Sequence, residues 1–257
     1  MLNTSSLSPL VRPGFLAGLL LLLLTALGLR AQAPAEGWST PFERSDSLAT
    51  ATHAEAIAFY RRLAEAFPQQ AALRSYGRTD AGRPLHLFIL DADAAFEPHE
   101  RPDKRRVLIN NGIHPGEPAG VDACMMYARD LLTGRADDGV LRNTTLLIIP
   151  LYNTGGALKG NCCTRANQVG PTRQGFRGNG RNLDLNRDFM KLDSRNARAF
   201  VTIFQLWQPD IFVDTHTSDG ADYQHTMTLI SGQKDKLGPE LGTYMHDAFV
   251  PKLYERM

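Results

Sequence analysis

The 257-residue sequence has little of several features that would place it in a specialised class. Lys and Arg number 28 against 27 Asp and Glu, a formal net charge of +1, so no charge excess points to nucleic acid or another polyanion as a partner. The sequence contains no internal repeat, no CxxC motif and no HExxH motif. Its composition, 43% apolar and 21% charged, is that of an ordinary globular protein, and its length allows one sizeable α/β domain or two small ones.

Cysteine is scarce, and its three positions are Cys124, Cys162 and Cys163. A disulfide between sequence neighbours closes a strained eight-membered ring, and no spacing typical of a zinc or redox site is present. We therefore predict buried or unpaired thiols rather than a zinc-binding or redox pair.

The one long apolar run is short for a membrane span. It extends over residues 15–29, after Arg12 and before Ala31-Gln32-Ala33, whereas a spanning helix needs about 20 residues. The A-x-A pattern after such a run is typical of a secretory signal peptide. We predict a signal peptide over residues 1–33, cleavage after Ala33, and export to the periplasm or beyond the cell without stable membrane association; a membrane anchor is the alternative.

Residues 34–50 are polar and contain proline, which indicates a leader before a single domain over 51–257. The domain opens with helical spacing of apolar residues over 53–67, with Thr52 and Glu55 placed as a capping box and Pro68 as the stop. Alternation over residues 72–90, broken around Asp80-Ala81-Gly82, predicts a β-hairpin.

Three further segments, 106–110, 144–153 and 210–216, are short apolar runs that suit strands covered on both faces. Helical patterns over 121–134 and 194–207 lie between them. This alternation predicts an α/β fold with a mixed, largely parallel twisted sheet and helices on both faces. Ligands of such sheets gather at the carboxyl ends of the strands, where His114 and His216 would then meet.

The stretch "NNGIHPGEPAG" places His114 and Glu117 three residues apart in a loop broken by glycine and proline. A catalytic zinc takes three protein ligands, and these two residues with His216 would provide them, although the same geometry accepts cobalt or manganese. Taken alone, the HxxE pattern also fits a solvated turn.

A second stretch, "RGNGRNLDLNRDF" over 177–189, is rich in groups that recognise anions. Asn186 and Arg187 could present an amide and a planar guanidinium to a carboxylate, and Arg177 could hold an oxyanion. The alternative is a basic, glycine-rich surface loop.

Together, "HPGE", "RGNGRNLDLNRDF" and "PDIFVDTH", in this order, resemble the zinc metallocarboxypeptidases, the carboxypeptidase A-like family. The resemblance implies one Zn²⁺ per chain, held by His114, Glu117 and His216, and peptide or protein C-termini as substrates. By the same resemblance, Arg177 polarises the scissile carbonyl and Asn186 with Arg187 binds the terminal carboxylate. Asp184 matches the acid that accepts a hydrogen bond from His114. Arg181 stands where that family usually has glycine.

The family's general-base glutamate lies far beyond the third zinc ligand, and no acid in the 41 residues after His216 aligns with it. We therefore expect an N-terminal and central part of such a catalytic domain, with the C-terminal portion missing; a shortened homologue without the base is the alternative. Two other functions stay open: a zinc-dependent deacylase of small N-acyl amino acids, and a non-catalytic zinc- and peptide-binding protein.

Overall fold

The computed structural model describes residues 37–136, 139–218 and 220–256. Its chain divides into two compact units, one running to Thr164 and including Gly170–His216, the other comprising Arg165–Val169 and the residues from Thr217 onward. The predicted signal peptide over residues 1–33 lies outside the described residues. Among the helices that are described, none has the length and apolar character needed to cross a bilayer.

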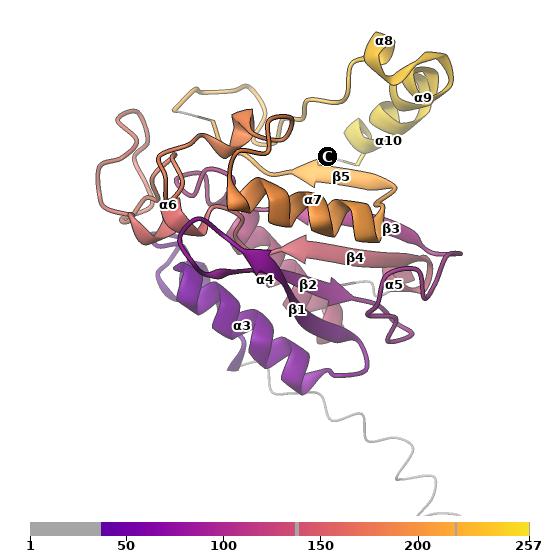
Figure 1. Ribbon diagram of the computed structural model, residues 1–257, viewed down its shortest axis with the longest axis horizontal. Coiled ribbons are helices and arrows are strands. Elements are labelled where there is room, and N and C mark those ends of the chain that lie inside the picture. The colour runs from indigo at the N-terminus through magenta and orange to yellow at the C-terminus, as the bar shows by residue number, and fades with distance from the viewer. Residues whose placement is uncertain (1–36, 137–138, 219, 257) are drawn as a thin grey trace, which may run out of the picture. The chain divides into compact units, whose positions relative to one another are not determined.

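The first unit is built on a five-stranded sheet with the order β1-β2-β4-β3-β5 (Figure 1). Its strands are β1 (Ala71–Arg78), β2 (Pro84–Leu90), β3 (Arg105–Asn110), β4 (Thr144–Ile149) and β5 (Ile211–Asp214). Pairing is parallel for β3 with β4 and with β5, and antiparallel for β1 with β2 and for β2 with β4. The predicted mixed α/β sheet is therefore present.

The hairpin and the first long helix form where the sequence predicts them. β1 and β2 pair around a turn in which Gly82 has a φ of 74°, a left-handed value that glycine adopts without strain. Helix α3 (His53–Ala66) begins after Thr52, and the side chains of Thr52 and Glu55 form the reciprocal capping box.

Helices cover both faces of the sheet. Alternate strand residues point to opposite faces, so Phe88 and Ile148 pack with α3 and α4 (Ala119–Leu132), whereas Ile89 and Leu147 pack with α7 (Arg195–Trp207). The predictions of helices near 121–134 and 194–207 are confirmed, with the first helix starting two residues earlier.

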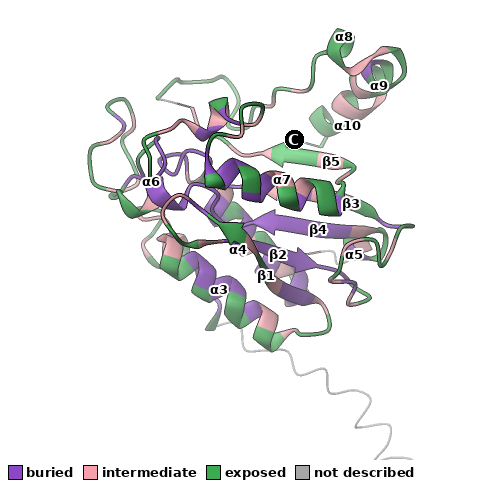
Figure 2. Cartoon of the chain, viewed as in Figure 1, coloured by how far each residue is buried: buried purple, intermediate pink, exposed green. Residues whose placement is uncertain are grey.

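Strand β5 differs from the prediction that all three apolar runs are covered on both faces. Strands β2 and β4 are mostly buried and β3 is partly buried. In contrast, Phe212 is 39% and Val213 40% exposed, and β5 is an edge strand of the sheet over the described residues (Figure 2). An apolar run shows that a segment favours burial, but burial also requires other elements to pack against the strand. The sequence of the run does not contain that information, so the prediction was wrong for β5.

The described part of the predicted leader packs against this unit. Trp38 is buried beside Phe59 of α3, and Glu43 of the short helix α2 (Pro41–Arg44) accepts a hydrogen bond from Arg129 of α4 at 2.6 Å. Residues 38–44 thus contribute core contacts rather than only leading into the fold.

The remaining elements are short. In the first unit they are α5 (Gly139–Asn143), α6 (Thr154–Leu158) and the 3₁₀ helix η2 (Leu185–Arg187). The second unit contains α8 (Lys234–Leu237), α9 (Pro239–Tyr244), the π-helix η3 (Met245–Phe249) and α10 (Val250–Tyr254).

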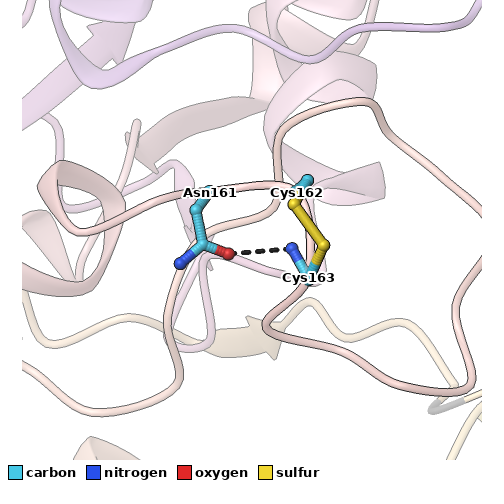
Figure 3. The surroundings of a disulfide bond; sticks show 3 residues. All are labelled: Asn161, Cys162 and Cys163. Carbon is cyan, nitrogen blue, oxygen red and sulfur yellow. Dashed lines mark hydrogen bonds between the residues drawn. A yellow bond between two sulfur atoms is a disulfide. The ribbon is translucent and has the colours of Figure 1, made fainter.

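The prediction of unpaired thiols at positions 162 and 163 is wrong. Cys162 and Cys163 are joined by a disulfide in an exposed loop, where the Asn161 side chain also accepts a hydrogen bond from the Cys163 backbone (Figure 3). Cys124 is free and buried, as predicted, and burial raises its pKa to about 11. Sequence neighbours place their thiols within bonding reach of each other, and the expected ring strain does not prevent the bond in this exposed loop.

Candidate metal centre

Three predicted side chains converge at the carboxyl ends of β3 and β5. His114 Nδ1 lies 3.1 Å from Glu117 Oε1, and His216 Nδ1 lies 2.9 Å from Glu117 Oε2. One nitrogen or oxygen atom from each residue falls within 4.8 Å of the others. His114 and Glu117 are buried, whereas the His216 side chain is 37% exposed.

Local backbone structure places these groups. His114 and Glu117 occupy the loop between β3 and α4, which closes on itself where the Glu117 N–H donates to the His114 carbonyl at 2.9 Å. His216 comes two residues after the end of β5. The start of α4 meets that strand end so closely that a Cβ added at Gly120 would lie 2.1 Å from Thr215 Oγ1. Glycine at position 120 therefore permits the approach of the two ligand-bearing segments.

The donor set fits zinc. Two ligands of one tetrahedral zinc at about 2.0 Å lie about 3.3 Å apart, close to the two separations between the histidine nitrogens and Glu117. Two imidazoles and one carboxylate are also the donor types of a catalytic zinc site with a position left for water. His114, Glu117 and His216 would hold the ion.

Both histidines turn their second nitrogen to a carboxylate. His114 Nε2 lies 3.0 Å from Asp184 Oδ1, and His216 Nε2 lies 3.0 Å from Asp214 Oδ2. An Nε2–H that donates to the carboxylate leaves the Nδ1 lone pair directed at the centre. Asp184 was identified from the sequence, but Asp214 was missed. The D-x-H spacing in "DTH" was the available signal, because alternate residues of an extended chain point the same way.

Charge at the centre is dominated by carboxylates. Hydrogen bonds to Asp214 and then to Glu117 raise the pKa of His216 to about 9, against the opposing effect of burial. Burial tends to raise the pKa of Asp184, but the hydrogen bond with His114, a backbone N–H and the charge of Arg177 together lower it. The carboxylates of the site thus stabilise a positive charge placed between them.

Arg177 lies at the rim of this group. Its Nε and Nη2 atoms are each 3.0 Å from Asp184 Oδ2, and its Nη1 is 3.8 Å from Glu117 Oε1. The side chain is 45% exposed, so Asp184 holds it in place while part of the guanidinium remains accessible from solvent. Arg181, at the position where the resemblance expects glycine, does not have a positive φ; the neighbouring Asn182 does, at 60°.

The structure links Asn186 and Arg187 to the centre through Asp184. Asp184 caps η2 by accepting from the Asn186 N–H at 3.0 Å, and its carbonyl accepts from the Arg187 N–H at 3.0 Å. The Arg187 guanidinium donates to the Asn186 carbonyl at 2.8 Å. The same aspartate therefore supports His114 and begins the turn that carries this pair.

A buried asparagine that the sequence analysis missed joins the two loops of the site. Asn153 Nδ2 donates to the carbonyls of Ile113 at 3.2 Å and Arg177 at 2.9 Å, while its Oδ1 accepts from the Gly156 N–H at 2.8 Å. Its place just after β4, at the carboxyl edge of the sheet, was the signal that could have found it.

Comparison with known proteins points to one family. Residues 56–243 match the family described as zinc carboxypeptidase. Carboxypeptidase 2 of Trichophyton rubrum is 26% identical over 159 residues, which are 62% of this chain and 27% of that protein. Carboxypeptidase D of Drosophila melanogaster is 31% identical over 134 residues, 49% of this chain and 9% of that protein. The chain thus spans about a third or less of the curated relatives it matches.

Solved structures share the fold. A metallo-carboxypeptidase from Burkholderia cenocepacia has a TM-score of 0.52 at 22% identity, covering 72% of this chain and 47% of the other. Carboxypeptidase A from Helicoverpa armigera has a TM-score of 0.50 at 15% identity, covering 80% and 53%. The predicted carboxypeptidase A-like architecture is confirmed.

Proposed function

Since the chain belongs to the zinc carboxypeptidase family, we propose that it acts as a zinc-dependent metallocarboxypeptidase that releases C-terminal residues from peptides. One observation carries the proposal. The Nδ1 atoms of His114 and His216 converge on Glu117, and each opposite Nε2 is held by a carboxylate. Such an arrangement of ligands and supporting carboxylates suits the binding of one metal ion.

The side chains around the centre would contact different groups of a peptide substrate. Arg177, anchored on Asp184, is placed to stabilise negative charge that develops on a peptide carbonyl oxygen. Asn186 and Arg187 supply an amide and a guanidinium for the free carboxylate at the end of a peptide. When bound, zinc supplies Lewis acidity toward the carbonyl and lowers the pKa of water toward 7.

Glu117 belongs to the ligand set rather than to proton transfer. Its two carboxylate oxygens face His114 and His216 at 3.1 and 2.9 Å, so both are directed at the centre. A carboxylate bound to a metal has lost most of its basicity. The proposal therefore assigns no general base among the described residues.

We also propose that the protein is exported. The apolar run over 15–29 and the Ala31-Gln32-Ala33 pattern support a cleaved signal peptide, and the Cys162–Cys163 disulfide fits an oxidising compartment. N-terminal sequencing of the protein recovered from outside the cytoplasm should begin at Pro34. A mature protein that still begins at Met1 would contradict this.

The test of the activity compares peptides that differ only at the C-terminus. Zinc-loaded protein should release the last residue from a peptide with a free carboxylate, and chelation should stop the release. Arg187→Ala should raise KM for the free acid, whereas Arg61→Ala, an exposed arginine of α3, should behave as wild type. The products are measured by mass spectrometry.

The other outcomes separate the alternatives. Equal loss on C-terminally amidated peptides would contradict the role given to Arg187. Hydrolysis of N-acyl amino acids in place of peptides would indicate a deacylase. Binding of zinc and of free C-termini without any turnover would indicate a peptide-binding protein.

A further inference from the structure

The two proposed histidine ligands are supported in different ways. His114 is 2% exposed and is enclosed by the loop that carries it, and its partner Asp184 comes from a loop 70 residues later that also binds Arg177. His216 is 37% exposed and follows an edge strand. Packing alone leaves its ring freer to rotate, so its orientation depends more on hydrogen bonds.

Those hydrogen bonds come from Asp214, which is itself held in place. Asp214 Oδ2 faces His216 Nε2 at 3.0 Å, and its Oδ1 accepts from Asn110 Nδ2 at 2.9 Å. Asn110 and Asp214 are the last register pair of β3 and β5, and Asn110 is fully buried. The Asn110 carbonyl also accepts from the Thr215 N–H at 3.1 Å. The carboxylate is therefore fixed to the neighbouring strand.

We propose that Asp214, anchored by Asn110, is a positioning residue that holds His216 with Nδ1 toward the metal. The inference rests on the proposed function because it concerns the same centre. Asp214 touches neither the ion nor a substrate; it acts through His216. By this arrangement the sheet itself, through the β3–β5 pair, sets the direction of the third ligand.

Asp214→Asn tests the role with little change in shape. An aspartate offers acceptor oxygens to both His216 and Asn110, whereas an asparagine has one acceptor oxygen and an NH₂ group. An asparagine at position 214 keeps its one acceptor for His216 only if its NH₂ group faces Asn110, whose side-chain amide must then turn over to accept from it. Loss of a carboxylate that orients a metal-binding histidine costs about 10- to 100-fold in metal affinity. Asn110→Ser, which leaves the carboxylate but removes its anchor, should cost about threefold to tenfold.

Asp210→Asn is the matched control. Asp210, the residue before β5, also binds β3, because its Oδ2 accepts from the Arg106 N–H at 2.8 Å. It lies at the far end of the strand from His216. A general weakening of the β3–β5 contact would therefore affect both aspartate variants, whereas the positioning role would affect only Asp214→Asn.

The experiment measures zinc affinity of the full chain by competition with a chromogenic chelator, together with denaturant unfolding of the metal-free proteins. We expect wild-type affinity for Asp210→Asn, about 10- to 100-fold weaker binding for Asp214→Asn, and similar unfolding curves for the two. NMR of the zinc-loaded protein should show the His216 Nε2–H proton protected from exchange, and this protection should be lost in Asp214→Asn.

Several results would overturn the inference: unchanged affinity in both Asp214→Asn and Asn110→Ser, an equal loss in Asp210→Asn, or no zinc binding by the wild type. If Asp214→Asn does not fold, Asn110→Ser decides alone. Zinc binding that depends on Asp214 without any peptide hydrolysis would overturn the proposed function and leave this inference standing.

Discussion

The two ends of the central sheet each gather carboxylates, but they do so differently. At the amino ends of β3 and β4, Asp91 is fully buried, and its oxygens accept from Lys104 Nζ at 2.8 Å and Thr145 Oγ1 at 2.6 Å. Lys104 is 1% exposed and also donates to the Leu141 carbonyl at 3.0 Å. This cluster contains its own cation and is complete.

At the carboxyl ends of β3 and β5, three acids surround two histidines. Glu117 faces both Nδ1 atoms, and Asp184 and Asp214 face the two Nε2 atoms. Arg177 is positively charged, but it lies at the rim and forms its short ion pair with Asp184. The positive charge at this end comes from His216, whose pKa is raised to about 9, and from Arg177, whose Nη1 lies 3.8 Å from Glu117 Oε1.

The two clusters differ in the cation that balances their carboxylates. Burying charges is costly unless they are paired, and a protein can pair them with its own lysine or with an ion from solution. The amino-end cluster uses the first solution, and under the proposed function the carboxyl-end cluster uses the second. The direction of the histidine nitrogens, more than the number of acids, distinguishes them.

The largest effect is expected when a histidine of the carboxyl-end cluster is removed. His114→Ala or His216→Ala removes one of three ligands and should abolish measurable zinc binding, as followed by equilibrium dialysis and metal analysis. His99→Asn is the control, since His99 is exposed and asparagine tolerates its φ of 69°. Zinc retained at full stoichiometry in His216→Ala would show that the ion binds elsewhere.

Breaking the amino-end cluster should affect stability instead. Lys104→Met leaves Asp91 buried beside no ammonium and should lower the free energy of unfolding by about 3–5 kcal/mol. Zinc affinity should not change. Arg101→Met, which removes an exposed partner of Asp93 and Asp103, should change stability far less. Chemical denaturation measures both, and equal effects would contradict the contrast between buried and exposed pairs.

Gly120→Ala should disturb the metal centre without a change in any ligand. The new Cβ would overlap Thr215 Oγ1, so α4 and the end of β5 must separate. Such overpacking costs about 1–3 kcal/mol of unfolding free energy and should weaken zinc binding at the same time. The amino-end cluster should be unaffected, so combining Gly120→Ala with Lys104→Met should give additive losses of stability. A stable variant with wild-type zinc affinity would contradict the close approach.

The smallest effect concerns a histidine that lacks carboxylate partners. Burial, then the nearby His86 and Arg83, lower the pKa of His53 to about 4, whereas His216 among acids has a raised pKa. In the unfolded chain His53 takes up a proton near pH 6.5, but in the fold it does not until about pH 4. Stability should therefore fall as the pH is lowered between these values.

His53→Gln removes this contribution. Both proteins should have a lower free energy of unfolding at pH 4.5 than at pH 7, as measured by denaturant unfolding. Because the ring is partly exposed, we expect this decrease to be only about 1 kcal/mol smaller in the variant than in wild type. Parallel pH profiles for the two proteins would show that His53 titrates normally in the fold.

Local patterns predicted much of this fold because they report local physics. The capping box of Thr52 and Glu55 and the turn at Gly82 depend on residues within a few positions of each other, and both form as expected. The exposure of Phe212 depends on which elements lie beside β5, and no pattern within the strand contains that information.

The candidate site divides in the same way. The sequence indicated His114, Glu117, His216 and Asp184 through spacing and resemblance, and the structure brings all four together. The pairing of Asp214 with Asn110 is set by the register of two strands about a hundred residues apart, which sequence reasoning could not supply. The two loops joined by Asn153 likewise meet only in the fold.

The most direct test of the contrast between the two clusters is X-ray absorption spectroscopy at the zinc edge of the protein loaded with one equivalent. We expect nitrogen and oxygen ligands at about 2.0–2.1 Å, including two imidazoles, in wild type, whereas His216→Ala should retain no zinc at this centre. Sulfur at about 2.3 Å, or a shell of oxygen atoms alone, would place zinc outside the centre formed by His114, Glu117 and His216.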